Sequence, residues 1–264
     1  MNWKQLILEQ IRRIKPSRYG WKGDYSSWEA AKKQAGSYDD AVILEKVQQA
    51  ALKVRNGEAV YERDSVLFDK IEYSWPLVAA IMWVAAKNKG KLTVADFGGS
   101  LGSSYFQNKV FLDDLPDLKW CVIEQPNFVQ SGNLHFKNTK LDFFETLDDC
   151  IKEKGTPDIL ILSCVLPYLE EPYIFLDKIS MYQIQHILID NTYFNFDCRD
   201  RICVQTVSPA IYKASYPCWL LSGQRIRQSL QQYYRILSEH KNNSVIFIEG
   251  KKIIYEGFLA IRTE

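Results

Sequence analysis

The spacing of apolar residues along the chain changes near Gly90. Before this point, apolar residues recur at helical spacing, and Ser, Pro and Gly stand where helices begin and end. We therefore predict helices that end before Pro16, near Gly36, near Arg55 and at Lys89. After Gly90, short apolar runs alternate with helical stretches, which is typical of a parallel sheet covered on both faces.

Each predicted helix has its own start signal. Leu6, Ile7, Ile11 and Ile14 form one apolar stripe, which favours a core-facing helix over a membrane-surface one. Ser26-Ser27-Trp28-Glu29 has the Ser and Glu spacing of a capping box, and a third helix is expected from about Asp40. Ser74-Trp75-Pro76 opens a fourth helix, because Ser can cap and Pro is tolerated in a first turn.

The second part of the chain predicts the sheet. Candidate strands are 92–97, 120–124, 141–144, 158–163 and 186–190, with further strands at 234–237, 245–248 and 257–261. The final pair could be antiparallel. Residues 191–220 show no clear period and are expected to form a long insertion. The fold class is therefore α/β: an N-terminal helical cap, 1–90, is followed by a Rossmann-like domain, 91–264, with helices on both faces of its sheet.

The composition and charge of the chain exclude several classes of protein. The 264 residues are 47% hydrophobic with a net charge of +1, which excludes disorder and argues against a nucleic-acid partner. The six cysteines include no C-x-x-C pair, which favours reduced thiols and a cytoplasmic location. Charged residues interrupt Met1–Ile14, unlike a signal peptide, and the run Trp75–Ala86 is shorter than the roughly 20 residues that span a membrane.

A glycine-rich turn follows the first predicted strand of the sheet. In Asp96-Phe97-Gly98-Gly99-Ser100-Leu101-Gly102 the backbone can approach a ligand closely. The G-x-G-x-x-G fingerprint of dinucleotide-binding proteins would need glycines where Ser100 and Ser103 stand. The turn therefore argues against a nicotinamide-dependent dehydrogenase. An acid two residues before the first glycine suits S-adenosylmethionine (SAM), whose amino group is cationic.

A second acid ends the next strand. Glu124 lies 28 residues after Asp96, where a carboxylate can accept hydrogen bonds from both ribose hydroxyls. Alone, a glycine-rich turn is often an ordinary strand-to-helix connection; together with Glu124 it predicts a cofactor site. The candidate cofactor contacts are Asp96, Gly98, Gly99, Ser100, Gly102, Glu124 and the adjacent Gln125.

With these residues the sequence resembles class I SAM-dependent methyltransferases, and more closely a family found among bacterial surface-polysaccharide genes. The resemblance spans nearly the whole chain. It rests on Tyr19-Gly20-Trp21, Tyr25-Ser26-Ser27-Trp28, Ala59-Val60-Tyr61-Glu62-Arg63-Asp64, Asp96 to Ser104, Val165-Leu166-Pro167-Tyr168-Leu169 and Ile189-Asp190-Asn191-Thr192. Asn191 stands where the family pattern has Arg, which puts any substrate contact of that Arg in doubt.

The resemblance implies roles for further residues. Ser163 and Cys164 would border the methionine part of SAM, and Tyr168 would open toward the transferred methyl group. Thr146 and Leu147 would flank the adenine, although an ordinary helix cap and a core contact explain them equally well. Tyr168 has the same alternative of packing on the core.

A hydroxyl acceptor would need a base to remove its proton. Asp190 is the first candidate, because it ends the fifth strand at the edge where α/β sheets bind ligands; it could equally cap the next turn. His135 and His240 sit in polar segments without a partner motif, and His186 begins a strand at the opposite edge. We predict no metal, because no cluster of His and acids has ligand spacing.

The acceptor is expected between the carboxyl edge of the sheet and the helical cap. Candidate lining residues are Tyr25, Trp28, Tyr61, Arg63 and Tyr105, with Tyr193, Tyr212, Tyr216 and Trp219 as a lid. Singly, each aromatic is more often a core residue. An arginine flanked by two acids, as Arg63 is, more often forms a surface ion pair, although its guanidinium could bind a phosphate through two parallel N–H groups.

The favoured function is methyl transfer from SAM to a small polar acceptor, by resemblance a sugar or glycan-precursor hydroxyl. The alternatives are a SAM-binding scaffold without catalysis, a nucleotide-dependent oxidoreductase, and RNA methylation, against which the balanced charge argues. The sequence indicates no oligomeric state.

Overall fold

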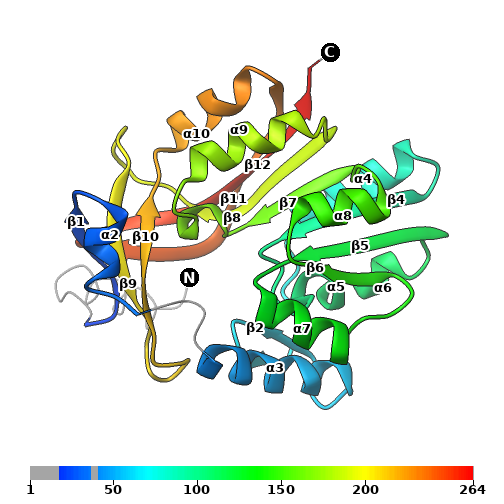
Figure 1. The fold of residues 1–264 in the computed structure, drawn as a ribbon, viewed down its shortest axis with the longest axis horizontal. Helices are drawn as coiled ribbons and strands as arrows, with labels where there is room; N and C mark the ends of the chain where they lie inside the picture. Colours follow the sequence, from blue (N-terminus) through cyan, green and yellow to red (C-terminus); the bar gives the residue numbers. More distant parts are fainter. Residues whose placement is uncertain (1–17, 37–40, 264) are drawn as a thin grey trace.

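A seven-stranded sheet forms the centre of the computed structural model, which describes residues 18–36 and 41–263 (Figure 1). Its strand order is β11-β12-β8-β7-β4-β5-β6. The strands are β4 (Lys91–Phe97), β5 (Asp117–Ile123), β6 (Leu141–Phe144), β7 (Ile159–Ser163), β8 (His186–Tyr193), β11 (Tyr234–Ile248) and β12 (Lys251–Arg262). From β6 to β8 all neighbours are parallel, whereas β12 runs antiparallel to both β8 and β11.

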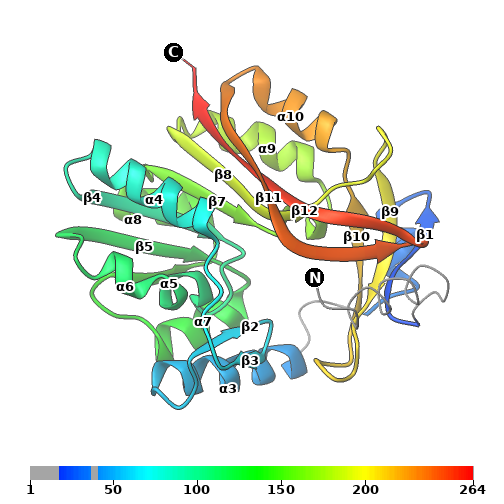
Figure 2. The ribbon, with the colours of Figure 1, turned by 180° about the vertical axis from the view of Figure 1, so that it is seen from behind.

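Helices cover both faces of this sheet, because successive residues of a strand point to opposite faces and both sets of residues are apolar. Val94 belongs to one buried cluster, with α3 to α7, and its neighbour Ala95 belongs to the other, with α8 to α10. Figure 2 shows α4 in front of the sheet, on the face that α3 to α7 cover. The helices are α3 (Ala41–Arg55), α4 (Trp75–Lys87), α5 (Ser103–Gln107), α6 (Lys109–Leu112), α7 (Pro126–His135), α8 (Leu147–Lys154), α9 (Pro172–Met181) and α10 (Gly223–Gln231). The predicted Rossmann-like α/β fold is confirmed.

A second, three-stranded sheet faces the carboxyl edge of the first (Figure 1). Its order is β1-β9-β10, formed by β1 (Gly20–Tyr25), β9 (Arg201–Thr206) and β10 (Ser215–Leu220). The short helix α2 (Trp28–Lys32) packs on it, and the 3-10 turn η1 (Leu166–Tyr168) lies against β10. The long hairpin β11–β12 runs from the central sheet to β1.

The prediction that the first 90 residues are helical was wrong in part. Helices form at α2, α3 and α4, but β1 is a strand, and β2 (Tyr61–Arg63) pairs with β3 (Val66–Phe68) in a hairpin. Strand β1 is held by its non-local pairing with β9, which no local pattern encodes. The predicted helix around Ile7 lies outside the described residues.

Several predicted boundaries also changed. The cap of α2 is Ser27, whose Oγ accepts from the backbone N–H of Ala30, and not Ser26. The two predicted strands at 234–237 and 245–248 are one strand, β11, which pairs antiparallel with β12 as anticipated. The aperiodic insertion 191–220 contains β9 and β10, whose edges are completed by β1.

Two further observations concern the described ranges. No helix there is both long and apolar enough to cross a membrane. No group of three or more His, Cys, Asp or Glu residues in 18–36 and 41–263 could hold a metal ion.

Candidate functional site

The glycine-rich turn leaves β4 at the carboxyl edge of the sheet. Gly98 and Gly102 have φ of 74° and 89°, in the left-handed region that favours glycine. A Cβ on Gly98 would lie 2.7 Å from Val165, and one on Gly99 would lie 2.6 Å from the carboxylate of Asp96. The turn is therefore packed so closely that both positions require glycine.

Two carboxylates, Asp96 and Glu124, meet beside this turn. Asp96 is buried and accepts a hydrogen bond from Trp120 Nε1 at 3.2 Å. Burial raises the pKa of Asp96 to about 7, and the charge of Glu124 adds to the rise. Burial also raises the pKa of Glu124. Among the described residues neither acid has a Lys or Arg partner, so a cationic ligand would relieve both.

Glu124 also orders the turn. Its Oε1 accepts from Ser100 N at 3.2 Å and its Oε2 from Gln125 N at 2.9 Å. Ser100 has φ of 55°, so it adopts the left-handed conformation that a glycine would take without strain. The predicted cofactor contacts from Asp96 to Gly102, with Glu124 and Gln125, therefore come together at one place.

The end of β7 carries the next polar cluster. Ser163 is the last residue of β7, and Cys164 N donates to Asp190 O at 3.0 Å. Burial raises the pKa of Cys164 to about 12, and the negative charge of Asp64 adds to the rise. Arg63 and Asp190 also act on this thiol. Charged groups from the β2–β3 hairpin and from β8 therefore converge on Cys164.

Tyr168, in η1, also faces this cluster. Its hydroxyl lies 2.8 Å from Gln205 Oε1 and donates to it, while its ring meets Tyr216 edge-on at 5.5 Å. Burial raises the pKa of Tyr168 well above its ordinary value. A phenol that keeps its proton can orient a ligand but is a poor base, so any part it takes in transfer stays a prediction.

Asp190 has a partner that the sequence did not reveal. His240 Nε2 lies 2.8 Å from Asp190 Oδ1, and the side chains are 14% and 2% exposed. The expectation that His240 lacks a partner was wrong, because His240 lies within the continuous strand β11 and not in a connecting segment. His186 pairs with Ile159 at the far edge, as predicted, and its Nδ1 contacts Asp158 O.

Glu62 is a further residue that the sequence reading missed. It is buried on β2, and its Oε1 accepts from the hydroxyl of Ser103, the first residue of α5. Its Oε2 is buried without a partner among the described residues, and burial raises the pKa of Glu62 to about 7. The signal available was the charged run that surrounds Arg63, which we read as a surface ion pair.

Other predicted residues lie apart from this cluster. Tyr25 and Trp28 pack on the far face of the small sheet, with Ala31 and Ile202. Tyr105 is buried between core aromatics. Thr146 caps α8, its Oγ1 accepting from Asp149 N at 3.1 Å, and Leu147 is buried in the core. Tyr193, Tyr212 and Tyr216, in contrast, are buried near Cys164 or the β2–β3 hairpin. Acceptor or adenine contacts by any of these residues stay predictions.

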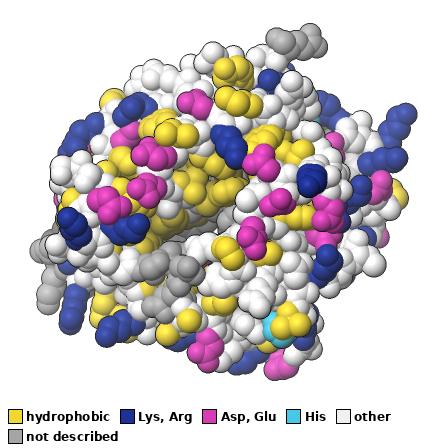
Figure 3. Space-filling view, in the orientation of Figure 1, with side chains coloured by type: hydrophobic (Ala, Val, Ile, Leu, Met, Phe, Trp, Pro, Cys, Tyr) yellow, Lys and Arg dark blue, Asp and Glu magenta, His cyan; other side chains and the backbone are white. Residues whose placement is uncertain are grey.

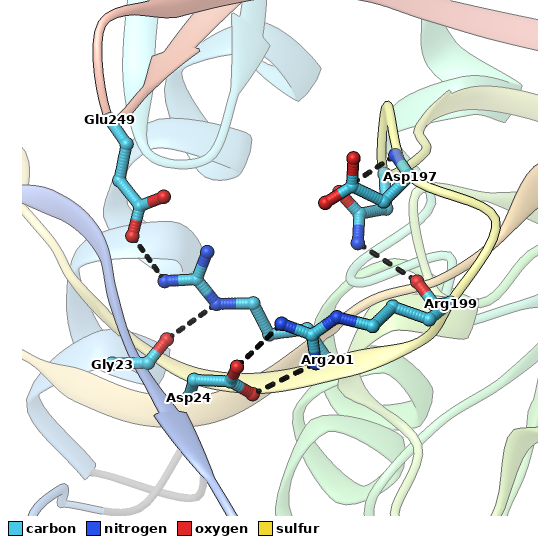
Figure 4. A network of polar contacts seen from close by, with 7 residues as sticks. Gly23, Asp24, Asp197, Arg199, Arg201 and Glu249 are labelled. Carbon is cyan, nitrogen blue, oxygen red and sulfur yellow. Dashed lines mark hydrogen bonds and ion pairs between the residues drawn. The ribbon is translucent and has the colours of Figure 1, made fainter.

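Figure 3 shows a hollow with a hydrophobic floor near the middle of the molecule, where in Figure 1 the central sheet meets the small sheet. A separate cavity of about 610 Å³ is lined by residues of β1, α9, β9 and α10. Figure 4 shows the ion pairs beside this cavity: Arg199 with Asp24 at 2.6 Å, and Arg201 with Glu249 at 2.5 Å. These arginines are already paired, so we assign the network to joining β1, β9 and the β11–β12 turn.

Comparison with known proteins gives structural neighbours only. The sequence matches no protein-family model and no curated protein. A magnesium protoporphyrin IX methyltransferase from Synechocystis PCC 6803, with bound S-adenosylhomocysteine (SAH), is 14% identical over 72% of this chain and 83% of that chain, with a TM-score of 0.44.

Two other solved structures are similar to the chain. The N-methyltransferase NodS from Bradyrhizobium japonicum WM9, in complex with SAH, is 10% identical over 74% of this chain and 90% of its own, with a TM-score of 0.44. The N-terminal domain of EvdMO1, in the presence of SAH and D-fucose, is 12% identical over 100% of this chain and 98% of its own, with a TM-score of 0.46. We therefore infer the function of this chain from its own residues and not from these neighbours.

Proposed function

We propose that this chain is a SAM-dependent methyltransferase that acts on a hydroxyl of a small polar acceptor. The observation that carries the proposal is the pair of carboxylates, Asp96 and Glu124, beside a turn in which Gly98 and Gly99 leave no room for side chains. SAM carries a cationic amino group and a sulfonium, which suit two acids that have no cationic partner among the described side chains. Its ribose hydroxyls suit Glu124.

When bound, SAM supplies a methyl group that is already activated for displacement. The protein then has to align the acceptor oxygen and exclude water. Glu124 and the turn hold the cofactor end, and the polar groups around Cys164 border the place where an acceptor would lie. A residue that takes the hydroxyl proton completes the chemistry.

For the acceptor we propose a sugar or a glycan precursor. The family resemblance suggests this class, and the groups that converge on Cys164 offer both donors and acceptors for hydroxyls. Arg63 adds a cation, and its guanidinium lies over the ring of Phe68, 5.8 Å from the ring centre. A guanidinium that stacks on an aromatic ring can still donate hydrogen bonds from its edge to a phosphate on a nucleotide sugar.

Calorimetric titration with SAM and with SAH tests the cofactor site. We expect micromolar binding that Glu124→Ala abolishes and that Glu153→Ala, which removes an exposed acid from α8, leaves unchanged. A folded protein that binds neither ligand would overturn the proposal. Binding of a nicotinamide dinucleotide in their place would favour an oxidoreductase.

A screen with methyl-tritiated SAM tests the reaction. The acceptors are monosaccharides, nucleotide sugars and phenols, each with the wild-type protein and with Glu124→Ala as the blank. Transfer to a sugar or nucleotide sugar supports the glycan-precursor acceptor, whereas transfer to phenols alone contradicts it. SAM binding without transfer to any acceptor would favour the alternative of a non-catalytic scaffold.

A further inference from the structure

The contact between Asp190 and His240 joins two strands that are not neighbours. β12 lies between β8 and β11, and since adjacent strands are about 4.8 Å apart, β8 and β11 are separated by roughly 10 Å. Side chains across such a gap normally meet the side chain of the middle strand instead. Here Nε2 of His240 reaches within 2.8 Å of Asp190 Oδ1.

Gly257 makes this contact possible. It pairs with His240 in the register of β11 and β12, and it lies at an irregularity in the pairing of β12 with β8. A Cβ on Gly257 would lie 2.3 Å from Nε2 of His240 and 2.5 Å from the ring Cε1. The imidazole therefore occupies the space that any other residue at position 257 would fill.

A second polar contact crosses the same strand. Asn191 follows Asp190 with φ of 47°, and its Oδ1 accepts from Nδ2 of Asn242 at 3.0 Å. His240 and Asn242 are two residues apart on β11. Two consecutive residues of β8 are thus each bonded to β11, which holds the two strands in a fixed relation around the histidine ring.

The pair lies at the carboxyl edge, where a ligand of the central sheet would bind. Asp190 pairs with Ser163 in the β7–β8 register, and its backbone oxygen accepts from Cys164 N. Asp64 and Arg63, from the β2–β3 hairpin, act on the same thiol as Asp190. A carboxylate accepts the Nε2 proton of a neutral imidazole, which leaves the lone pair of Nδ1 to accept another proton.

We propose that His240 is the general base of the methyl transfer, with Asp190 and Gly257 as the residues that position it. This inference rests on the proposed function. The acceptor oxygen forms a bond to the methyl carbon while the carbon–sulfur bond breaks, leaving its electron pair on sulfur. The hydroxyl proton passes to Nδ1 of His240, Asp190 stabilises the imidazolium, and water then removes the proton.

The tautomer of His240 tests the geometry without any acceptor. Long-range proton–nitrogen NMR of the SAH-bound protein should show the Nε2–H tautomer. In Asp190→Asn the amide can donate in place of accepting, so the population should shift toward Nδ1–H. A wild-type His240 in the Nδ1–H tautomer would overturn the inference. Gly257→Ala, checked for folding by circular dichroism, should abolish the wild-type tautomer signature by displacing the ring.

Turnover of a hydroxyl acceptor from the tritium screen tests the catalytic role. We expect His240→Gln to lower the rate by about 10² to 10⁴, with partial recovery at high pH where the hydroxyl ionises more readily. His135→Gln, at the end of α7, is the matched control and should keep full activity.

The two proposals fail differently. SAH affinity should stay within twofold of wild type in His240→Gln, since the histidine belongs to the acceptor side. If the wild type binds SAH and His240→Gln turns over at more than a tenth of the wild-type rate, only the role of His240 is refuted. If the wild type does not bind SAH, the proposed function itself fails.

Discussion

The substitution Asp96→Asn tests whether a buried acid is kept for a cationic ligand at a cost to stability. In the folded protein burial raises the pKa of Asp96 from 3.8 to about 7. A group whose pKa is raised on folding contributes stability that is fully present below the unfolded pKa and is lost as pH rises through the folded pKa. For Asp96 this loss runs from about pH 4 to about pH 7.

The magnitude follows from the shift. Each unit between the two pKa values corresponds to 1.36 kcal/mol, so wild type should lose about 3 kcal/mol relative to Asp96→Asn between pH 5 and pH 8. The amide keeps an oxygen that can accept from Trp120 Nε1, so the packing is retained. The variant should therefore be the more stable protein at pH 8 and yet bind SAM far more weakly.

Urea denaturation of the ligand-free proteins at pH 5 and pH 8, followed by circular dichroism, measures this difference. Asp114→Asn, which changes an exposed acid, controls for the loss of one charge. A stability difference between wild type and Asp96→Asn that stays constant over this range would refute the reasoning. SAM affinity gives an independent check, because wild-type binding should strengthen more steeply than that of the variant, which keeps only Glu124, as pH rises toward 7.

Three further substitutions test the turn and its surroundings. Gly99→Ala should destabilise the protein and abolish SAH binding, because the new Cβ would lie 2.6 Å from the Asp96 carboxylate; thermal unfolding and calorimetry measure both effects. Ser100→Gly should keep SAH affinity and raise the unfolding free energy by up to about 1 kcal/mol, since glycine takes the left-handed conformation without strain; a lower melting temperature would contradict this. Thr146→Ala should cost about 1 kcal/mol through loss of the cap to Asp149 N while SAH affinity is unchanged, and a clear fall in affinity would support an adenine contact instead.

The sequence predicted the central sheet and its glycine-rich turn because their signals are local. Buried strands such as β4 and β7 are continuous apolar runs, and Asp96, Gly98 and Glu124 stand at fixed positions at strand ends. These elements need only their own residues to be recognised.

The parts that were missed depend on partners far along the chain. β1 pairs with β9, in the register Gly20 with Thr206, and neither strand shows a strong alternation of its own. The contact of Asp190 with His240 spans 50 residues and exists only because Gly257 lies between them. A histidine in a polar stretch carries no local sign of such a contact, so its partner had to come from the structure.

The small sheet also bears on how the chain is divided. The predicted boundary near residue 90 stays a prediction, but β1, which lies before it, forms one sheet with β9 and β10, which lie in the insertion 191–220. Strand β10 of this sheet lies against η1. Tyr168 in η1 bonds Gln205 of β9, and Arg201 of β9 bonds Glu249 in the turn of the long hairpin. The small sheet is thus bonded both to η1, which follows β7, and to the turn between β11 and β12. An acceptor that enters between the two sheets would meet the residues of η1, β8 and β11 together, which is the arrangement that a base on β11 requires.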